Sequence, residues 1–186
     1  MSEILLSITA GLVLFLFAIT NLSDTLKAAL GNNAQHWIKK YTSNSWSSLL
    51  VGIVITTLLD SSSATVGMAI ILSKKGLISL TGGIAVMLGA ELGTCSDTLL
   101  ATIKGSRQAL KTGLFHVTFN LLSIALGLAL FFPFTALVKI ISGGASVERT
   151  LANAHMLFNI FGVLIFIGTI PFFEKQLNRL LPDKIG

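Results

Sequence analysis

An acidic residue followed by a run of hydroxyl side chains lies between two apolar segments of the chain. The run begins at Asp60, continues through Ser61, Ser62 and Ser63, and ends at Thr65. Aspartate and serine are poor residues for a helix interior because their side chains compete for backbone hydrogen bonds. Hydroxyl groups can donate hydrogen bonds to an anion, and a carboxylate can hold a hard cation. The run therefore predicts a break between two helices that offers ligands to a small ion.

The apolar segments beside this run are each too short to cross a membrane. Residues 47–59 provide about four turns of helix and residues 64–73 about three, whereas a spanning helix needs about twenty residues. We therefore expect residues 47–73 to form a re-entrant helical hairpin whose polar break lies deep in the membrane. Broken helices of this kind hold substrates and ions in secondary transporters. An ordinary kinked spanning helix is the alternative.

The composition is that of an integral membrane protein. Of the 186 residues, 53% are hydrophobic and 11% are charged, and the mean hydropathy is +0.83. The net charge of +5 is spread in small groups between apolar segments, which suits contact with anionic headgroups and offers no basic run to nucleic acid. We therefore expect a multi-pass protein of a cell membrane with membrane lipids as its surroundings and no nucleic-acid partner.

The order of apolar segments predicts an all-α helical bundle that forms a single transmembrane domain over residues 1–186. The expected elements are a first helix at 4–22, an interfacial segment at 24–41, the hairpin at 47–73, an interrupted helix at 77–103, a long helix at 113–141 that Pro133 ends or kinks, and a last helix at 151–173 that Pro171 closes.

The interruption at 77–103 is expected at residues 89–98, where two glycines, Glu91 and Asp97 break an apolar segment. A charge at the bilayer centre costs about 2.5 to 3.5 kcal/mol on insertion scales, so both acids should face protein or water. A loop outside the membrane is the alternative for this segment.

The two long helices near the end of the chain share a pattern of histidine and asparagine. His116 and Asn120 are four residues apart, as are His155 and Asn159, so each pair lies on one helix face. Such pairs most often bridge neighbouring membrane helices, and lining of an ion or substrate site is the second interpretation.

Together these motifs resemble one repeat of the sodium/phosphate cotransporter family. The resemblance covers residues 8–173 and rests on the segments 11–17, 56–65 and 88–94 and on both His-x-x-Phe-Asn elements. In that family the repeat occurs twice with inverted topology, and each copy contributes a serine hairpin to a central site for sodium and phosphate. The resemblance implies substrate binding by Ser61, Ser62, Ser63 and Thr65, with Thr94 nearby, and sodium as the coupling ion.

The chain departs from the family pattern by its acids. Asp60 stands where the family has glutamine, Glu91 stands where it has asparagine, and Asp97 adds a further carboxylate. An amide can donate to a phosphate oxygen, whereas an ionised carboxylate only accepts and repels an anion. We therefore expect these acids to bind cations, with sodium at Asp60 and Glu91; proton carriage or a substrate other than phosphate are the alternatives.

The chain also holds only one copy of the repeat, so a complete site requires a second chain. We expect a homodimer. If the hairpin is re-entrant, the basic residues divide almost evenly between the two faces, which permits dual topology and an antiparallel arrangement of the two chains. If the hairpin spans the membrane, one orientation is favoured. Pairing with a related half-transporter is the other possibility, and the prokaryotic inner membrane is the expected location.

The expected function is therefore secondary active, sodium-coupled transport of phosphate or another small ion by alternating access, with no cofactor and no enzymatic activity. A cation transporter (sodium, proton or divalent) or a cation-binding accessory half is the alternative, because of the three acids. A membrane phosphatase with a serine nucleophile and His116 or His155 as base is disfavoured, since no Arg or Lys lies in the apolar segments near the serines.

Overall fold

The computed structural model describes residues 2–103 and 105–182, apart from the side chains of residues 19, 22–23, 26–35, 37 and 97. All regular structure within these ranges is helical, which confirms the expected all-α class. The elements in chain order are α1 (Ser2–Tyr41), α2 (Ser45–Leu59), α3 (Ser62–Lys74), α4 (Leu80–Ile103), α5 (Arg107–Ala129), α6 (Phe131–Ser142), α7 (Val147–Phe166), the short 3-10 helix η1 (Ile167–Thr169) and α8 (Ile170–Leu180).

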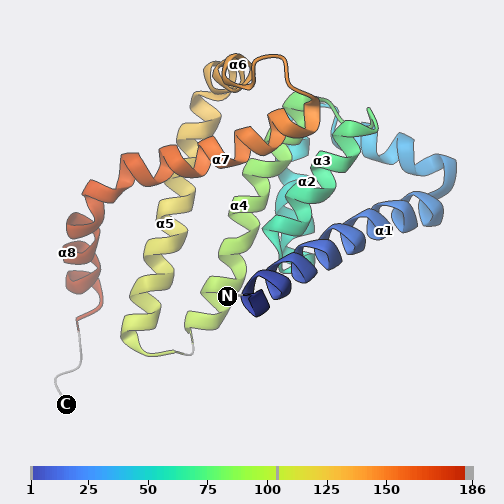
Figure 1. Ribbon diagram of the computed structural model, residues 1–186. Coiled ribbons are helices and arrows are strands. Elements are labelled where there is room, and N and C mark those ends of the chain that lie inside the picture. The colour runs from blue at the N-terminus through green and yellow to red at the C-terminus, as the bar shows by residue number, and fades with distance from the viewer. Residues whose placement is uncertain (1, 104, 183–186) are drawn as a thin grey trace.

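Helix α4 is the centre of the bundle, with α2 and α3 on one side and α5 on the other, and α7 crosses α5 and α4 to reach α3 (Figure 1). Ile84, Met87 and Leu88 in its first half are fully buried, and Leu151 and Ala154 of α7 pack into the same core. A helix that is covered on several sides can be apolar around most of its circumference, which is the composition of α4. Polar side chains of α2, α5 and α7 hydrogen-bond to this one helix.

The backbones of α2 and α4 touch through glycines. A Cβ atom on Gly52 would lie 2.1 Å from the carbonyl oxygen of Val86, and one on Gly89 would lie 2.0 Å from the carbonyl oxygen of Leu49. Both distances are far inside van der Waals contact, so no side chain fits at either position. Small residues permit this close packing between membrane helices. The glycines of α4 therefore fix the hairpin against the bundle.

Helices α2 and α3 form the expected helix, break and helix, but the break is only Asp60 and Ser61 long. Asn44 caps the start of α2 with a capping box, and the hydroxyl of Ser61 accepts from the Ala64 amide at the start of α3. One capping serine is enough to start a helix, so Ser62 and Ser63 belong to the first turn of α3. The course of this pair through a membrane stays a prediction.

The predicted interruption of α4 at residues 89–98 is wrong, because the helix is continuous over Leu80–Ile103. Its glycines serve the contact with α2 instead of unwinding the chain. Its hydroxyl groups bond back to the preceding turn, from Thr94 to the Ala90 carbonyl at 3.0 Å and from Thr98 to the Thr94 carbonyl at 3.5 Å. Polar side chains that are satisfied within their own helix give it no reason to break.

Two other boundaries differ from those expected, whereas the break near Pro133 agrees with the expectation. The segments 4–22 and 24–41 are both part of α1, which contains no proline to end it. The segment 113–141 divides into α5 and α6 at Leu130, as predicted from Pro133, whose missing N–H leaves the Ala129 carbonyl without a donor. The segment 151–173 does not end at Pro171, since the proline lies in the first turn of α8, where no donor is needed.

Three of the described helices are long and apolar enough to cross a membrane: Leu80–Ile103, Arg107–Ala129 and the joined segment Val147–Leu180. Shorter apolar helices lie at Ser2–Ala18, Ser45–Leu59 and Phe131–Ser142. The protein is therefore a helical membrane protein.

The last helices fold back on α5. In Figure 1, α6 crosses the end of α5, and α8 turns away from the direction of α7 to lie beside the first half of α5. There the Lys111 ammonium donates to Asn178 at 2.6 Å.

Candidate functional site

The break between α2 and α3 presents polar groups at an exposed tip. Asp60 ends α2 in the left-handed conformation, with φ at 54°, and is the only non-glycine residue with positive φ in the described ranges. Aspartate tolerates this conformation better than most residues. Asp60 and Ser63 are exposed, and Ser61 and Ser62 are half-buried. The tip thus combines one carboxylate with the serines at the start of a helix.

The first turn of α3 can attract an anion. The Ala64 amide is capped by the Ser61 hydroxyl and the Thr65 amide donates to the Ser61 carbonyl, which leaves the amides of Ser62 and Ser63 outside the helical ladder. Unpaired amides at a helix start carry partial positive charge, and serine hydroxyls add further donors. The carboxylate of Asp60 beside them opposes an anion and favours a cation.

Thr65 holds the hairpin together. Its hydroxyl is buried, lies 2.8 Å from the buried hydroxyl of Thr56 on α2, and also donates to the Ser61 carbonyl at 3.2 Å. Thr56 was not among the candidate residues of the sequence. Its place on the same face of α2 as Ser48 and Gly52, at intervals of four, is the pattern that could have indicated it. Substrate binding by Thr65 stays a prediction, and its contacts here join the two arms of the hairpin.

A second polar contact links the hairpin to α4. The Ser96 hydroxyl lies 3.4 Å from that of Thr57 near the end of α2, and it donates to the Gly93 carbonyl at 2.6 Å. Thr94, two residues before Ser96, donates to the Ala90 carbonyl of its own helix and is half-buried. The glycine-threonine segment of α4 therefore lies beside the arm of the hairpin that ends in Asp60.

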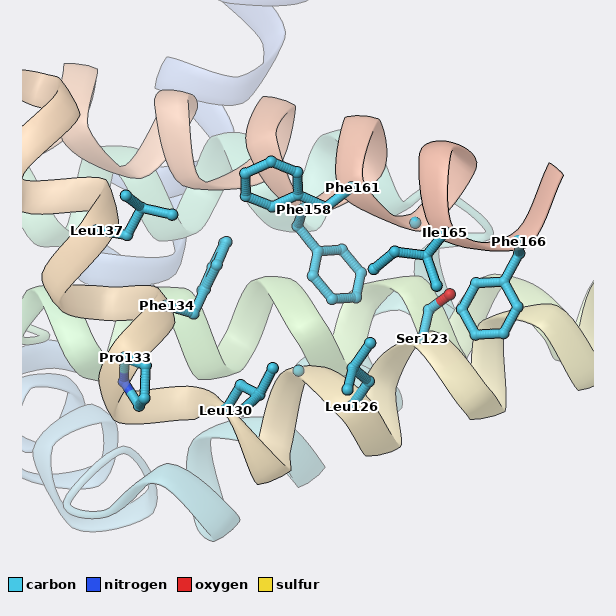
Figure 2. Close-up of a pocket in the computed structure, with 12 residues that line it drawn as sticks. Ser123, Leu126, Leu130, Pro133, Phe134, Leu137, Phe158, Phe161, Ile165 and Phe166 are labelled. Carbon is cyan, nitrogen blue, oxygen red and sulfur yellow. The ribbon is translucent and has the colours of Figure 1, made fainter. Parts of the chain in front are cut away.

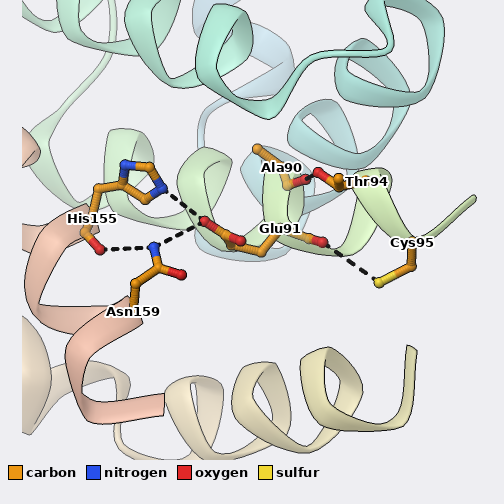
Figure 3. A network of polar contacts seen from close by, with 6 residues as sticks. All are labelled: Ala90, Glu91, Thr94, Cys95, His155 and Asn159. Atoms are coloured by element: carbon orange, nitrogen blue, oxygen red, sulfur yellow. Dashed lines mark hydrogen bonds and ion pairs between the residues drawn. The ribbon is translucent and has the colours of Figure 1, made fainter. Parts of the chain in front are cut away.

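Glu91 lies on the opposite side of α4 and is bound by α7 (Figure 3). His155 Nε2 is 2.8 Å from Glu91 Oε1, and the Asn159 amide donates to the same oxygen at 3.3 Å. The Glu91 side chain is only 14% exposed. A carboxylate in an apolar bundle requires such donors, since an unpaired buried charge is costly. His155 and Asn159 thus join α7 to α4 through one acidic side chain.

The other histidine and asparagine pair joins α5 to α4. His116 Nδ1 is 3.0 Å from the Thr98 hydroxyl, and the Asn120 amide donates to the Cys95 sulfur at 3.4 Å. Glu91, Cys95 and Thr98 follow one another at helical spacing, so a single face of α4 receives both pairs. These hydrogen bonds run between helices, and any contact of the four residues with a transported ion stays a prediction.

The predicted cation ligands are not assembled into one cluster within the described residues. Asp60 is at the exposed hairpin tip, Glu91 is bound by α7, and the Asp97 side chain lies outside the described part of the structure. No three His, Cys, Asp or Glu side chains in the described ranges are grouped so that they could hold a metal ion. A sodium ion at either acid would therefore need hydroxyl or carbonyl oxygens as its other ligands.

The fold and the site define a helical membrane protein with a polar helix break packed on a glycine-rich helix, and comparison with known proteins specifies its family. The model of the Na+/Pi-cotransporter family matches residues 14–172, and the chain belongs to this family. Its members are transporters and not enzymes, so the phosphatase hypothesis loses its basis.

Two relatives illustrate the relationship. The chain is 33% identical over 141 residues to the uncharacterized protein YqeW of Bacillus subtilis, which covers 76% of this chain and 45% of YqeW. It is 30% identical over 123 residues to the sodium-dependent phosphate transport protein 2A of mouse, which covers 62% of this chain and 19% of the mouse protein. The chain thus spans less than half the length of the curated relatives it matches. No solved structure matches it significantly.

Proposed function

We propose that the protein is a secondary active transporter that couples sodium to the movement of phosphate or a similar small inorganic anion. The observation that carries the proposal is the break at Asp60 and Ser61, where serine hydroxyls and free amides begin α3 in a chain of the Na+/Pi-cotransporter family. The mouse relative is named as a sodium-dependent phosphate transporter. A re-entrant course of α2 and α3 would bring this break to the depth where transporters bind their substrates.

In this proposal the serines and the acids have different partners. Ser61, Ser62 and Ser63, with Thr65 and Thr94 behind them, contact the anion, while Asp60 supplies a cation ligand beside it. Binding both ions together reduces the repulsion that the carboxylate alone would exert on phosphate. Glu91 and Asp97 are the further candidates for the cation, in company with backbone carbonyls.

A cation transporter, or a cation-binding accessory half, is the second candidate. It is favoured by the exposed Asp60 carboxylate, which stands directly before the serines, where the family has a neutral glutamine. An uncompensated negative charge at that position selects against anions. The two candidates differ in whether sodium is the partner of a transported anion or the transported ion itself.

We further propose that two chains form one transport unit, as an antiparallel homodimer of dual topology or with a related half. Within a single chain the hairpin tip is not buried by other helices, since Leu58 is 75% exposed and Leu59 is 40% exposed beside the exposed Asp60. A second copy in inverted orientation would supply the missing repeat that the resemblance implies. The cell membrane, in a prokaryote the inner membrane, is the proposed location.

Proteoliposomes that contain only this chain are expected to accumulate radiolabelled phosphate when sodium is higher outside, and to do so little when potassium replaces sodium. The reason is that only sodium moving down its gradient supplies the driving force. Filtered uptake over time measures the result, with protein-free liposomes as the control. Phosphate uptake that does not depend on sodium would contradict the coupling of phosphate to sodium. Sodium flux without phosphate movement would support the cation transporter instead.

A further inference from the structure

The hydroxyl of Thr56 makes a different bond from those of several other threonines in this protein. Thr94, Thr112 and Thr118 each donate to the carbonyl oxygen four residues earlier in their own helix, which is the usual bond of a threonine inside a helix. Thr56 is fully buried on α2 and donates instead to the Thr65 hydroxyl of α3, at 2.8 Å. This bond therefore joins the two arms of the hairpin.

Thr65 extends the connection to the tip of the hairpin. Its hydroxyl and its amide both donate to the Ser61 carbonyl oxygen, each at 3.2 Å. Because a hydroxyl has a single proton, Thr65 can only accept from Thr56, and consecutive bonds of this kind strengthen one another in a low-dielectric interior. We call this chain of hydrogen bonds, from Thr56 through Thr65 to Ser61, the threonine relay.

The threonine relay orients a group at the proposed anion site. The Ser61 carbonyl and the Ser62 N–H belong to the same planar peptide unit, so they point in opposite directions. Because the two donors of Thr65 hold the carbonyl inside α3, the Ser62 N–H is directed out of the start of the helix. That amide is one of the donors outside the helical ladder that an anion can accept from.

Helix α4 holds Thr56 from the other side. A Cβ atom on Gly93 would lie 2.6 Å from the Cβ atom of Thr56 and 3.0 Å from its methyl carbon. The methyl group of Thr56 therefore packs on the backbone of α4 while its hydroxyl reaches Thr65. One buried side chain thus connects the central helix of the bundle to the tip of the hairpin.

The apolar groove of the bundle is separate from the threonine relay. It lies between α5, α6 and α7, and its lining residues all fall between positions 123 and 166 (Figure 2). No hairpin residue is part of that lining, so the contacts that hold the tip come from within the hairpin and from α4.

We propose that Thr56 is a positioning residue for the transported anion, because it holds the Ser61 carbonyl inside α3 through Thr65 and so keeps the Ser62 amide directed at the anion. This role rests on the proposed function, in which the hairpin tip is the anion site. Thr56 itself is fully buried and does not touch the anion.

Thr56→Val and Thr56→Ser separate the hydroxyl from the packing. Valine keeps a methyl group beside Gly93 but cannot donate, whereas serine keeps the donor and lacks the methyl group. We expect Thr56→Val to raise the phosphate concentration at half-maximal sodium-driven uptake about fivefold, with little change in the maximal rate per chain, and Thr56→Ser to stay close to the natural value. Thr118→Val, which removes a hydroxyl bonded within α5, is the control and should change neither quantity.

Hydrogen exchange at the tip tests the positioning without any transport. The Ala64 and Thr65 amides both donate to Ser61, and mass spectrometry of a peptide that spans residues 60–68 follows them. In detergent we expect Thr56→Val to exchange these amides about fivefold faster than the natural protein, and Thr56→Ser to exchange them at the natural rate. If Thr56→Val does not fold, Thr56→Val combined with Thr65→Val replaces it in this measurement, since neither partner is then left unpaired.

Three outcomes would overturn the proposal. Unchanged exchange at the tip in Thr56→Val would do so whether or not the protein transports phosphate. Faster exchange with an unchanged phosphate half-saturation would show that the relay only braces the hairpin. A larger effect of Thr56→Ser than of Thr56→Val would show that packing matters and the hydroxyl does not. Absence of sodium-driven uptake by the natural chain would count against the proposed function, and the exchange comparison would still decide whether Thr56 positions the tip.

Discussion

Gly89→Ala is expected to lower the free energy of unfolding by about 3 kcal/mol, at the upper end of what overpacking usually costs. The added methyl group would lie 2.0 Å from the carbonyl oxygen of Leu49, a backbone atom that can move only if α2 moves. Because α2 carries one arm of the hairpin, the change should also displace the Asp60 tip. Thermal unfolding of the purified protein in detergent measures the loss.

Gly11→Ala is the matched control for this prediction. Gly11 is also in a helix, α1, but a Cβ atom there meets nothing within 4 Å, so alanine should stabilise the helix slightly through its better propensity. Equal unfolding temperatures for the two variants would contradict the close contact between α2 and α4.

Asp60→Asn is expected to reduce sodium-driven uptake at least about tenfold, which corresponds to losing roughly 1.4 kcal/mol of cation binding. Asparagine keeps the preference for the left-handed conformation that Asp60 adopts and removes only the negative charge, so the hairpin should keep its shape. The sodium dependence of uptake in proteoliposomes measures the effect, and the amount of protein in the membrane should not change. Full uptake by this variant would remove the Asp60 carboxylate from the transport site.

Asp60→Gln restores the residue of the family pattern and provides a second variant for the same uptake measurement. Phosphate uptake by Asp60→Gln, together with none by the natural chain, would indicate that the acid has redirected an inherited anion site toward cations. Ala at the same position removes both the charge and the hydrogen-bonding group, and it should abolish coupled uptake.

The helix break at Asp60 and Ser61 was predictable because its signal is local. Aspartate and three serines in succession disfavour a helix interior, and serine's preference for helix caps indicates that a second helix begins within the run. The sequence did not specify that Ser61 alone would serve as the cap, so the break is shorter than the polar run. The bond between Thr56 and Thr65 depends on how α2 and α3 fold back on each other, which no local pattern determines.

Helix α4 was mispredicted because glycine has two uses in a membrane helix. It can end a helix or let another helix approach, and only the position of α2 shows that Gly89 has the second use. The spacing of histidine and asparagine predicted that each pair lies on one helix face. Their partners on α4, Glu91 for one pair and Thr98 and Cys95 for the other, follow from the packing of three helices and were not accessible from spacing alone.

The most direct test of the central claim, that two chains together form one sodium-coupled transport unit, is uptake by mixed chains. Natural and Asp60→Ala chains are co-expressed in equal amounts, purified together and reconstituted for sodium-driven phosphate uptake. If both hairpins of a randomly formed pair must be intact, activity should fall to about a quarter of that of the natural protein. Activity of about half would show that each chain works alone and would contradict the claim, as would the absence of sodium-driven uptake by the natural chain.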